Sequence, residues 1–444
     1  MDQIVSVKLW GTTIGHLGYK PGQTEIATFE YTNTFAKSDI QFSPLRMKLP
    51  TAIHSFADIS QRTFKGLPGI FADSLPDKFG NQLIDLFMAE KNIAPENITS
   101  LDRLLYIGSR GMGALEYHPE MLKEKEENNL ALDVHSLAEL ASLVISKNKS
   151  KQDELLKTRT RSKAIRLIRV GSSAGGARSK ALISKSPDGQ IYDGTIDHGT
   201  DHGTAHHGTN HSYWLLKFDS EDNQDRDNKD PKGMTRVEYV YSILAKECGI
   251  DIPRTDFIED GGDFHFMIER FDRTKIKGRL EKLHYASWCG VDHAQRDSTG
   301  AYSYEQLAMV LRKLDLGQSA LTELFKRAVF NVVGRNHDDH TKQFGFLMDK
   351  SGKWTFAPAF DLTYSYDPNG KWTKGHQIRL ANKQSEFTRN DIIKFAKYCN
   401  INDKKSNKII DKTTSVFQSF SLYADKFNID SELKKTVCNN HLRL

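Results

Sequence analysis

Apolar and polar residues alternate along two stretches near the start of the chain, 5–10 (VSVKLW) and 25–32 (EIATFEYT), with glycines between them. This alternation is typical of strands that bury one face, so we expect a small sheet with hairpins. At 73–92 and 100–109 the apolar residues instead recur every three or four positions, which predicts helices. A short strand is expected at 113–118.

Strand and helix patterns are mixed in the middle of the chain. A helix is expected at 136–147, and strand-like runs at 181–184 and 212–219 flank a biased segment in which the unit Asp-His-Gly-Thr recurs with small changes. We expect that segment to be a disordered loop. Further elements are expected at 235–250 (helix), 251–259 and 263–272 (strands), 323–334 (helix) and 344–360 (hairpin).

These patterns divide the 444 residues into three regions. The charged run KEKEENN marks the end of a first α+β unit, so we predict a subdomain over 1–125. A mixed lobe is predicted over 126–285 and a mainly helical lobe over 286–444. A chain of this length has enough material for each region to bury a core of its own. The expected fold class is α+β.

Composition narrows the functional classes only slightly. No stretch approaches the roughly 20 apolar residues that a membrane span needs, and the first ten residues lack the layout of a secretory signal. We therefore expect a cytoplasmic protein without a membrane partner. The four cysteines are far apart and are expected to be reduced thiols. A net charge of +5 is too small to require a nucleic acid but is compatible with polyanionic ligands such as ATP.

A glycine-rich loop occupies residues 171–180 (GSSAGGARSK). Closely spaced glycines such as Gly175 and Gly176 let backbone N–H groups approach phosphate oxygens, so the loop is a candidate nucleotide cradle. Ala177 stands where a Walker A loop has its lysine, which disfavours P-loop NTPase chemistry. Taken alone, the loop is more typical of an ordinary flexible turn.

Lys217 lies in the apolar strand pattern WLLKFD, where a lysine either reaches the surface or turns inward to pair with an anion. In protein kinases, a strand lysine after the glycine-rich loop binds the nucleotide phosphates and pairs with an acidic helix residue. Glu238 lies on the next predicted helix and is a candidate partner. Thr235 and Glu238 also form a capping-box pattern, so the sequence leaves both roles open for Glu238.

The segment 336–343 (NHDDHTKQ) follows a predicted helix and precedes a predicted hairpin that ends at Asp361. Phosphoryl transfer requires one carboxylate that orients the attacking hydroxyl and a second that holds Mg²⁺ across the phosphates. Asp338 and Asp361 are our candidates for these two roles, because a hairpin that folds back on itself brings its ends together. The alternative interpretation is a polar turn that caps a helix.

Two further polar clusters have ordinary explanations. Five histidines of the repeat segment suggest a metal site, but a tolerated insertion is the default interpretation because the glycines oppose a preformed site. A basic run at 157–169 is compatible with a phosphate-rich or acidic partner, although a solvated helix face is the more common explanation. The histidines are His198, His202, His206, His207 and His211.

Taken in order, these segments resemble the HipA family of toxin kinases over nearly the whole chain. The resemblance rests on DSLPDKFG and RLLYIGSRGMGALEY in the first region, then on GSSAGGARSK, Lys217, IERFDR, NHDDHTKQ and FAPAFD. It implies a bilobal protein-kinase-like fold with an extra N-terminal α+β subdomain. It also implies phosphorylation of serine or threonine in proteins with ATP and Mg²⁺, and autophosphorylation in the glycine-rich loop.

The resemblance implies a role for each matching residue. Asp338 is matched to the catalytic aspartate, with His340 in the same loop, and Asp361 to a magnesium ligand. Where the family usually has an asparagine that binds Mg²⁺, this chain has Gln343, whose extra methylene shifts the amide oxygen. The remaining implied residues are the nucleotide-binding Gly175, Gly176, Ala177, Lys217 and Lys342, the adenine-pocket residues Glu269, Arg270 and Phe271, and the autophosphorylated Ser173 or, alternatively, Ser172.

The resemblance further implies a toxin of a type II toxin–antitoxin module that slows growth by phosphorylating a translation protein, such as an aminoacyl-tRNA synthetase. The expected partner is a small helix-turn-helix antitoxin, through which any contact with DNA is indirect. Two alternatives stay open. One is a small-molecule kinase with the same arrangement of aspartate and Mg²⁺. The other, suggested by Gln343, is a weakly active kinase-like co-repressor that acts with the antitoxin.

Overall fold

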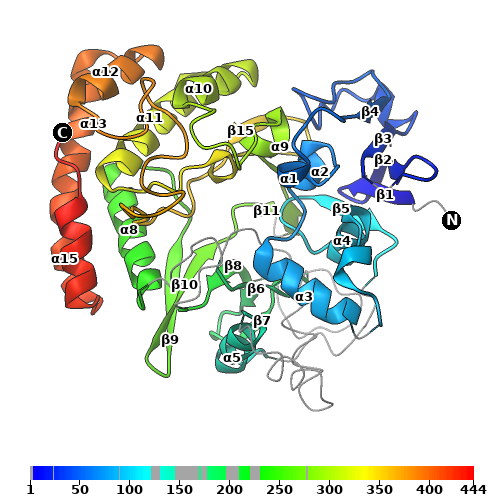
Figure 1. The fold of residues 1–444 in the computed structure, drawn as a ribbon, viewed down its shortest axis with the longest axis horizontal. Coiled ribbons are helices and arrows are strands. Elements are labelled where there is room, and N and C mark those ends of the chain that lie inside the picture. Colours follow the sequence, from blue (N-terminus) through cyan, green and yellow to red (C-terminus); the bar gives the residue numbers. More distant parts are fainter. Residues whose placement is uncertain are drawn as a thin grey trace.

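The computed structural model describes residues 4–23, 25–89, 91–121, 131–145, 170–171, 178–196, 210–220, 231–276 and 279–444. Figure 1 shows three regions: a blue N-terminal sheet on one side, a green sheet below, and orange and red C-terminal helices on the opposite side. Helices and largely antiparallel sheets are segregated along the chain, so the fold class is α+β, as the sequence predicts.

The N-terminal sheet is antiparallel and has the strand order β4-β3-β2-β1-β5. Val5, Val7 and Leu9 of the first strand are buried, and the residues between them are more exposed. This is the alternation that the sequence shows, and it fixes which face of the sheet meets the core. The strands are β1 (Ile4–Leu9), β2 (Thr12–Tyr19), β3 (Ala27–Tyr31), β4 (Ile53–Ser55) and β5 (Leu115–His118).

Short helices and turns connect β3 to β5. The longest, α3 (Lys78–Ala89), buries one apolar face, as its three- and four-residue spacing predicts. At α4 (Ser100–Ile107) a capping box between Thr99 and Asp102 sets the first turn. The others are α1 (Gln61–Phe64), α2 (Gly69–Ala72) and the 3-10 turns η1 (Phe35–Lys37) and η2 (Pro95–Asn97).

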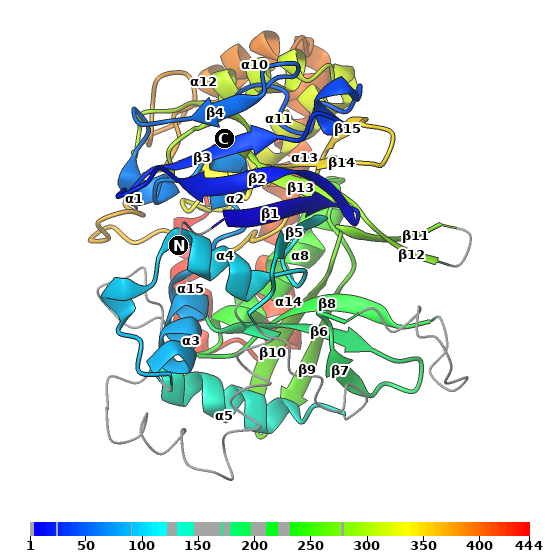
Figure 2. The same ribbon diagram turned by 90° about the vertical axis from the view of Figure 1, so that its right-hand side faces the viewer.

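The second sheet is also antiparallel, with the strand order β7-β6-β8-β10-β9. Its two faces are covered differently. The helix α8 (Met234–Cys248) contacts β10 and β9, whereas α5 (Val134–Ile145) and α3 share an apolar core with the other face (Figure 2). The strands are β6 (Lys180–Lys185), β7 (Ile191–Asp193), β8 (Ser212–Lys217), β9 (Thr255–Asp260) and β10 (Asp263–Glu269).

The core shared with α5 and α3 combines residues from two predicted regions. Phe79, Leu83 and Tyr106 of the N-terminal region pack with Trp214 and Leu216 of the second sheet. All five side chains are at most 1% exposed. The N-terminal subdomain and the mixed lobe therefore have a common interior.

A hairpin and a small sheet lead into the helical region. The sheet order is β13-β14-β15, and β13 straddles the predicted region boundary at residue 285. The strands are β11 (Arg273–Ile276), β12 (Arg279–Lys282), β13 (His284–Ser287), β14 (Gly345–Met348) and β15 (Trp354–Phe356). The helices are α9 (Trp288–Asp292), α10 (Tyr304–Lys313), α11 (Gly317–Val333), η3 (Thr341–Gln343), α12 (Arg389–Tyr398), α13 (Asp403–Gln418), α14 (Phe420–Lys426) and α15 (Ser431–Asn440).

Two expectations from composition can be compared with the structure. Across the described ranges, no helix is both long and apolar enough to cross a membrane. All four cysteines are free thiols, as predicted: Cys248, Cys289 and Cys399 are buried and Cys438 is partly exposed.

Candidate active site

Lys217 ends strand β8 with its side chain turned inward. Its ammonium Nζ lies 2.6 Å from Oε1 of Glu238 on α8, and both side chains are buried. The helix α8 begins at Met234 after Gly233, so Thr235 lies inside the helix and not at its N-cap. The ion pair is therefore the role that Glu238 takes, and the capping-box alternative is not realised.

Asp361 is the second partner of Lys217. The two side chains form an ion pair, and Asp361 has a backbone φ of 54°, an uncommon conformation for a residue other than glycine. Burial alone would raise the pKa of Asp361, but the charge and hydrogen bond of Lys217, the charge of Lys180 and the hydrogen bond from Gln343 together outweigh it, and the pKa is lowered. Burial alone would likewise lower the pKa of Lys217, and the two carboxylates reverse this. At Glu238 burial dominates and raises the pKa.

The predicted metal ligands Asp361 and Gln343 lie next to each other, because the Gln343 amide hydrogen-bonds the Asp361 carboxylate. Oxygen ligands of this kind suit Mg²⁺, which proteins often hold with one or two carboxylates together with substrate phosphates. Within the described ranges, no group of three or more His, Cys, Asp or Glu side chains forms a metal site by itself. The carboxylate of Asp361 and the amide oxygen of Gln343 are of a type that fits Mg²⁺.

The loop before β14 contains Asp338 and His340. Asp338 is 45% exposed at its side chain, and its backbone N–H donates to Ser365 Oγ at 2.9 Å. His340 Nε2 lies 3.7 Å from Asp338 Oδ1, while its Nδ1 accepts the Lys342 N–H at 3.2 Å and so caps η3. Gln343 of η3 meets Asp361 and Asp338 meets Ser365, so the loop touches the segment after β15 at both ends.

Asp339 is a residue of this loop that the sequence did not single out. Its carboxylate is completely buried and accepts from Tyr304 Oη at 2.7 Å, His376 Nδ1 at 2.7 Å and the Gln377 N–H at 2.8 Å. These bonds fasten the Asp338 loop to residues 376–377. Asp338 and Asp339 are adjacent in sequence, and their different burial in the structure distinguishes their roles.

Two aspartates from the N-terminal region were also missed, although both belong to the quoted motif DSLPDKFG. Asp73 Oδ1 lies 3.8 Å from Nζ of Lys342, one of the predicted nucleotide contacts. Asp77 Oδ2 lies 2.8 Å from Nζ of Lys180, at the exit of the glycine-rich loop. The charge of Lys180 also lowers the pKa of Asp361. The kinase-like site thus includes acidic groups from the first subdomain.

The predicted adenine-pocket segment connects β10 to the hairpin. The N–H of Arg270 donates to Tyr213 O at 2.8 Å, and its guanidinium binds the buried carboxylate of Asp272. The ring of Phe271 packs against Tyr285 and Phe360, the residue before Asp361. Glu269 is partly exposed and pairs with Arg254. The aromatic ring, rather than the arginine side chain, faces the Asp361 segment.

Several predicted residues lie outside the described part of the chain. They are Ser172, Ser173, Gly175, Gly176 and Ala177 of the glycine-rich loop, the basic run 157–169, and the repeat histidines before His211. The flanks of the loop are described, and Lys180 pairs in register with Lys217 across β6 and β8. Gly171, before the loop, also lies beside the first residue of β6, because a Cβ on Gly171 would lie 3.2 Å from Lys180 O.

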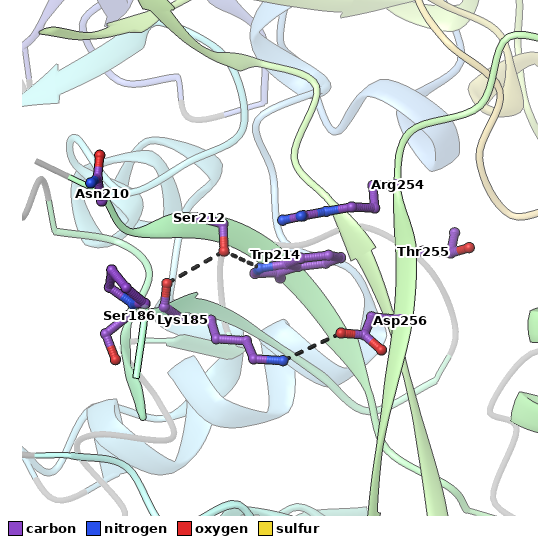
Figure 3. Close-up of a pocket in the computed structure, with 9 residues that line it drawn as sticks. Lys185, Ser186, Asn210, Ser212, Trp214, Arg254, Thr255 and Asp256 are labelled. Atoms are coloured by element: carbon purple, nitrogen blue, oxygen red, sulfur yellow. Dashed lines mark hydrogen bonds and ion pairs between the residues drawn. The ribbon is translucent and has the colours of Figure 1, made fainter. Parts of the chain in front are cut away.

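A cavity of about 320 Å³ lies elsewhere, at β6, β8 and β9 (Figure 3). The guanidinium of Arg254 stacks on the Trp214 ring at 4.8 Å, and Lys185 pairs with Asp256 at 3.3 Å. Trp214 and Lys217 are three residues apart in one strand, so their side chains point to opposite faces of the sheet. This cavity is therefore not part of the Lys217 site.

Comparisons with known proteins cover both halves of the chain. The family model of the HipA-like C-terminal domain matches residues 172–420, and that of the HipA N-terminal domain matches residues 5–118. Among solved structures, the complex of HipA, HipB and operator DNA from Shewanella oneidensis covers 98% of this chain and 94% of its own, with a TM-score of 0.65 and 15% identity. This likeness confirms the predicted kinase-like architecture with an N-terminal subdomain.

Curated relatives match over shorter stretches. A putative kinase of Haemophilus influenzae is 26% identical over 138 residues, and the serine/threonine-protein kinase toxin HipA of Shewanella oneidensis is 26% identical over 142 residues. These stretches cover 28% of this chain and 39% and 33% of the two relatives, respectively. The chain thus matches at most two fifths of the length of these relatives. With the C-terminal family model covering more than half of its residues, the chain belongs to the HipA family.

Proposed function

We propose that this chain is an ATP- and Mg²⁺-dependent serine/threonine protein kinase that acts as the toxin of a type II toxin–antitoxin module. The observation that carries this proposal is the ion-pair chain from Glu238 through Lys217 to Asp361. The loop with the exposed carboxylate of Asp338 contacts the segment that contains Asp361, through Gln343 and through the Asp338 backbone. Protein kinases use the same kinds of group for phosphoryl transfer: a strand lysine paired with a helix glutamate, a carboxylate for Mg²⁺ and a further aspartate for the substrate hydroxyl.

Each side chain has a task in this proposal. Asp338 orients the substrate hydroxyl and accepts its proton, and His340 caps the turn that follows. Lys217 binds the nucleotide phosphates, and Glu238 keeps its ammonium in place. Asp361 and Gln343 would hold Mg²⁺, which when bound neutralises charge that develops on the phosphates. Phe271, beside Phe360, provides an apolar surface for a flat base.

The partners are proposed from the relatives. The solved complex from Shewanella oneidensis contains HipB and operator DNA, so we propose a DNA-binding antitoxin for this chain, with DNA contacted through it. The proposed substrate is a translation protein such as an aminoacyl-tRNA synthetase, whose phosphorylation would slow growth.

The proposed activity is tested by incubating the purified protein with labelled ATP and a cell lysate, with Mg²⁺ or with EDTA. We expect acid-stable phosphoserine or phosphothreonine in protein with Mg²⁺, and loss of nearly all label with EDTA, since proteins commonly hold Mg²⁺ with one or two carboxylates together with substrate phosphates and waters. Label confined to small molecules, or equal with and without Mg²⁺, would contradict the proposal.

Autophosphorylation is proposed at Ser173 in the glycine-rich loop. Replacing Ser173 with alanine is expected to remove most label from the enzyme itself while label in other proteins persists. A phosphate at this position adds about two negative charges where ATP phosphates would bind, so the modified enzyme is expected to be inactive. Phosphopeptide mass spectrometry measures the site, and Ser172→Ala is the matched control. Unchanged incorporation in Ser173→Ala would refute the assignment.

A further inference from the structure

Two aspartates of one short segment each meet a lysine of the kinase-like site. Asp73 follows α2 and lies 3.8 Å from Lys342, and Asp77 precedes α3 and lies 2.8 Å from Lys180. Both aspartates belong to the N-terminal subdomain, whereas the lysines belong to the loop after Asp338 and to the strand after the glycine-rich loop. The pairs therefore cross between subdomains at two places.

Asp73 is held firmly in place. Its carboxylate accepts the Ser287 N–H at 2.6 Å and the Ser287 hydroxyl at 2.8 Å, and Ser287 itself is the N-cap of α9. A Cβ on Gly290 would lie 2.2 Å from Asp73 Oδ2, so the close approach depends on glycine at that position. A carboxylate fixed in this way, and only 7% exposed, offers Lys342 a counter-charge that hardly moves.

Asp77 is equally constrained. Its Oδ1 accepts the Gly80 N–H at 2.6 Å, which leaves Oδ2 for Lys180. Lys180 is 1% exposed, and a buried ammonium is strongly disfavoured unless it is paired. In the sheet Lys180 stands directly opposite Lys217, so two lysines share one edge of the site, and their repulsion is reduced by Asp77, Glu238 and Asp361.

We propose that Asp73 and Asp77 are positioning residues for phosphoryl transfer: Asp73 holds Lys342, and Asp77 holds Lys180, at the places where their ammonium groups meet the nucleotide phosphates. This inference rests on the proposed kinase function. It assigns the N-terminal subdomain a direct part in assembling the active site, beyond covering it. In this proposal each aspartate acts through the lysine that it contacts, and not by a contact with substrate.

A double-mutant cycle tests the inference. Wild type, Asp73→Asn, Lys342→Met and the double variant are compared by kcat and KM for ATP. We expect each single variant to lower kcat by about tenfold to 100-fold, because small displacements of a phosphate contact cost this much. The double variant is expected to be no slower than Lys342→Met, since Asp73 has no task once the ammonium is gone. If Asp73 has only a structural role, the losses in kcat of the two single variants are expected to multiply in the double variant. That result would overturn the inference.

A parallel cycle uses Asp77→Asn, Lys180→Met and their double variant, and we expect the same pattern of kcat values. This second cycle tests the positioning role if Asp73→Asn does not fold. The matched control is Asp292→Asn, which breaks the 2.9 Å pair with Arg46 between the N-terminal region and α9 without involving either lysine. Its kcat is expected to stay within about twofold of wild type. An equal loss in the control would mean that the interface in general matters, and would reject the positioning role. An inactive wild type would instead reject the proposed kinase function.

Discussion

Replacing Asp338 with asparagine is expected to lower the rate of phosphoryl transfer by roughly 10²- to 10⁴-fold, the contribution typical of a positioned general base. The fold is expected to remain intact. The side chain is 45% exposed, and the backbone N–H that anchors the loop to Ser365 is unchanged by the substitution. A change at such a site alters the free energy of unfolding by about 0.5 kcal/mol or less. Initial rates with labelled ATP and thermal melting together measure both effects.

The neighbouring variant Asp339→Asn is the informative control for Asp338→Asn. Its carboxylate is fully buried and serves Tyr304, His376 and the backbone of Gln377, so its loss is expected to lower the melting temperature. Asp338→Asn is expected to separate activity from stability, whereas Asp339→Asn affects both. If Asp338→Asn transferred phosphate at the wild-type rate, the assignment of the general base would be wrong.

Replacing Asp272 with asparagine is expected to cost about 3 to 5 kcal/mol of folding free energy, because two buried guanidinium groups lose their counter-charge. Asp272 and Arg270 have completely buried side chains, and Arg273 is 6% exposed. The carboxylate also accepts the Gly113 N–H at 2.6 Å, which links the N-terminal region to the segment after β10. Urea denaturation measures the loss.

The pH dependence of the Asp272 contribution follows from its pKa. Burial alone would raise this pKa, but the charges of Arg270 and Arg273 and the hydrogen bonds from Arg270 and the Gly113 N–H together outweigh it, and the pKa falls well below the usual range. Because the pKa is lower in the folded state, the stabilisation is complete above the unfolded pKa of about 3.9 and is lost only as the pH falls through the folded value. The difference in the free energy of unfolding between Asp272→Asn and wild type is therefore expected to be the same at pH 7 and at pH 5.5.

The exposed pair of Asp425 and Lys434 provides the control for Asp272→Asn. The two groups are 2.5 Å apart, but Asp425 is 64% exposed, so Asp425→Asn is expected to cost less than about 1 kcal/mol. A loss at Asp272 no larger than this would show that the buried arginines find other partners.

The elements that carry the site could be predicted from the sequence, because local patterns determine them. A short apolar run predicted strand β8 with Lys217, and helical spacing predicted α8 with Glu238. The sequence could not decide whether Glu238 caps a helix or pairs with Lys217. Thr235 and Glu238 match the capping-box pattern whether or not a helix begins at Thr235. The position of the first helical residue decided it.

Contacts between distant segments could not be predicted in this way. Asp73 and Ser287 are 214 residues apart in sequence, and nothing in the pattern around either residue indicates the other. The same holds for Asp77 and Lys180, whose partnership depends on how α3 packs beside the second sheet. The motif DSLPDKFG supported the family resemblance, but the tasks of its acidic residues became visible only with their partners in place.

The apolar core that Phe79, Leu83 and Tyr106 share with Trp214 and Leu216 has a consequence for how the chain is held together. Separate family models match residues 5–118 and 172–420, yet neither region can leave the other without exposing large aromatic and aliphatic side chains to water. We therefore expect the two regions to unfold together and not one after the other.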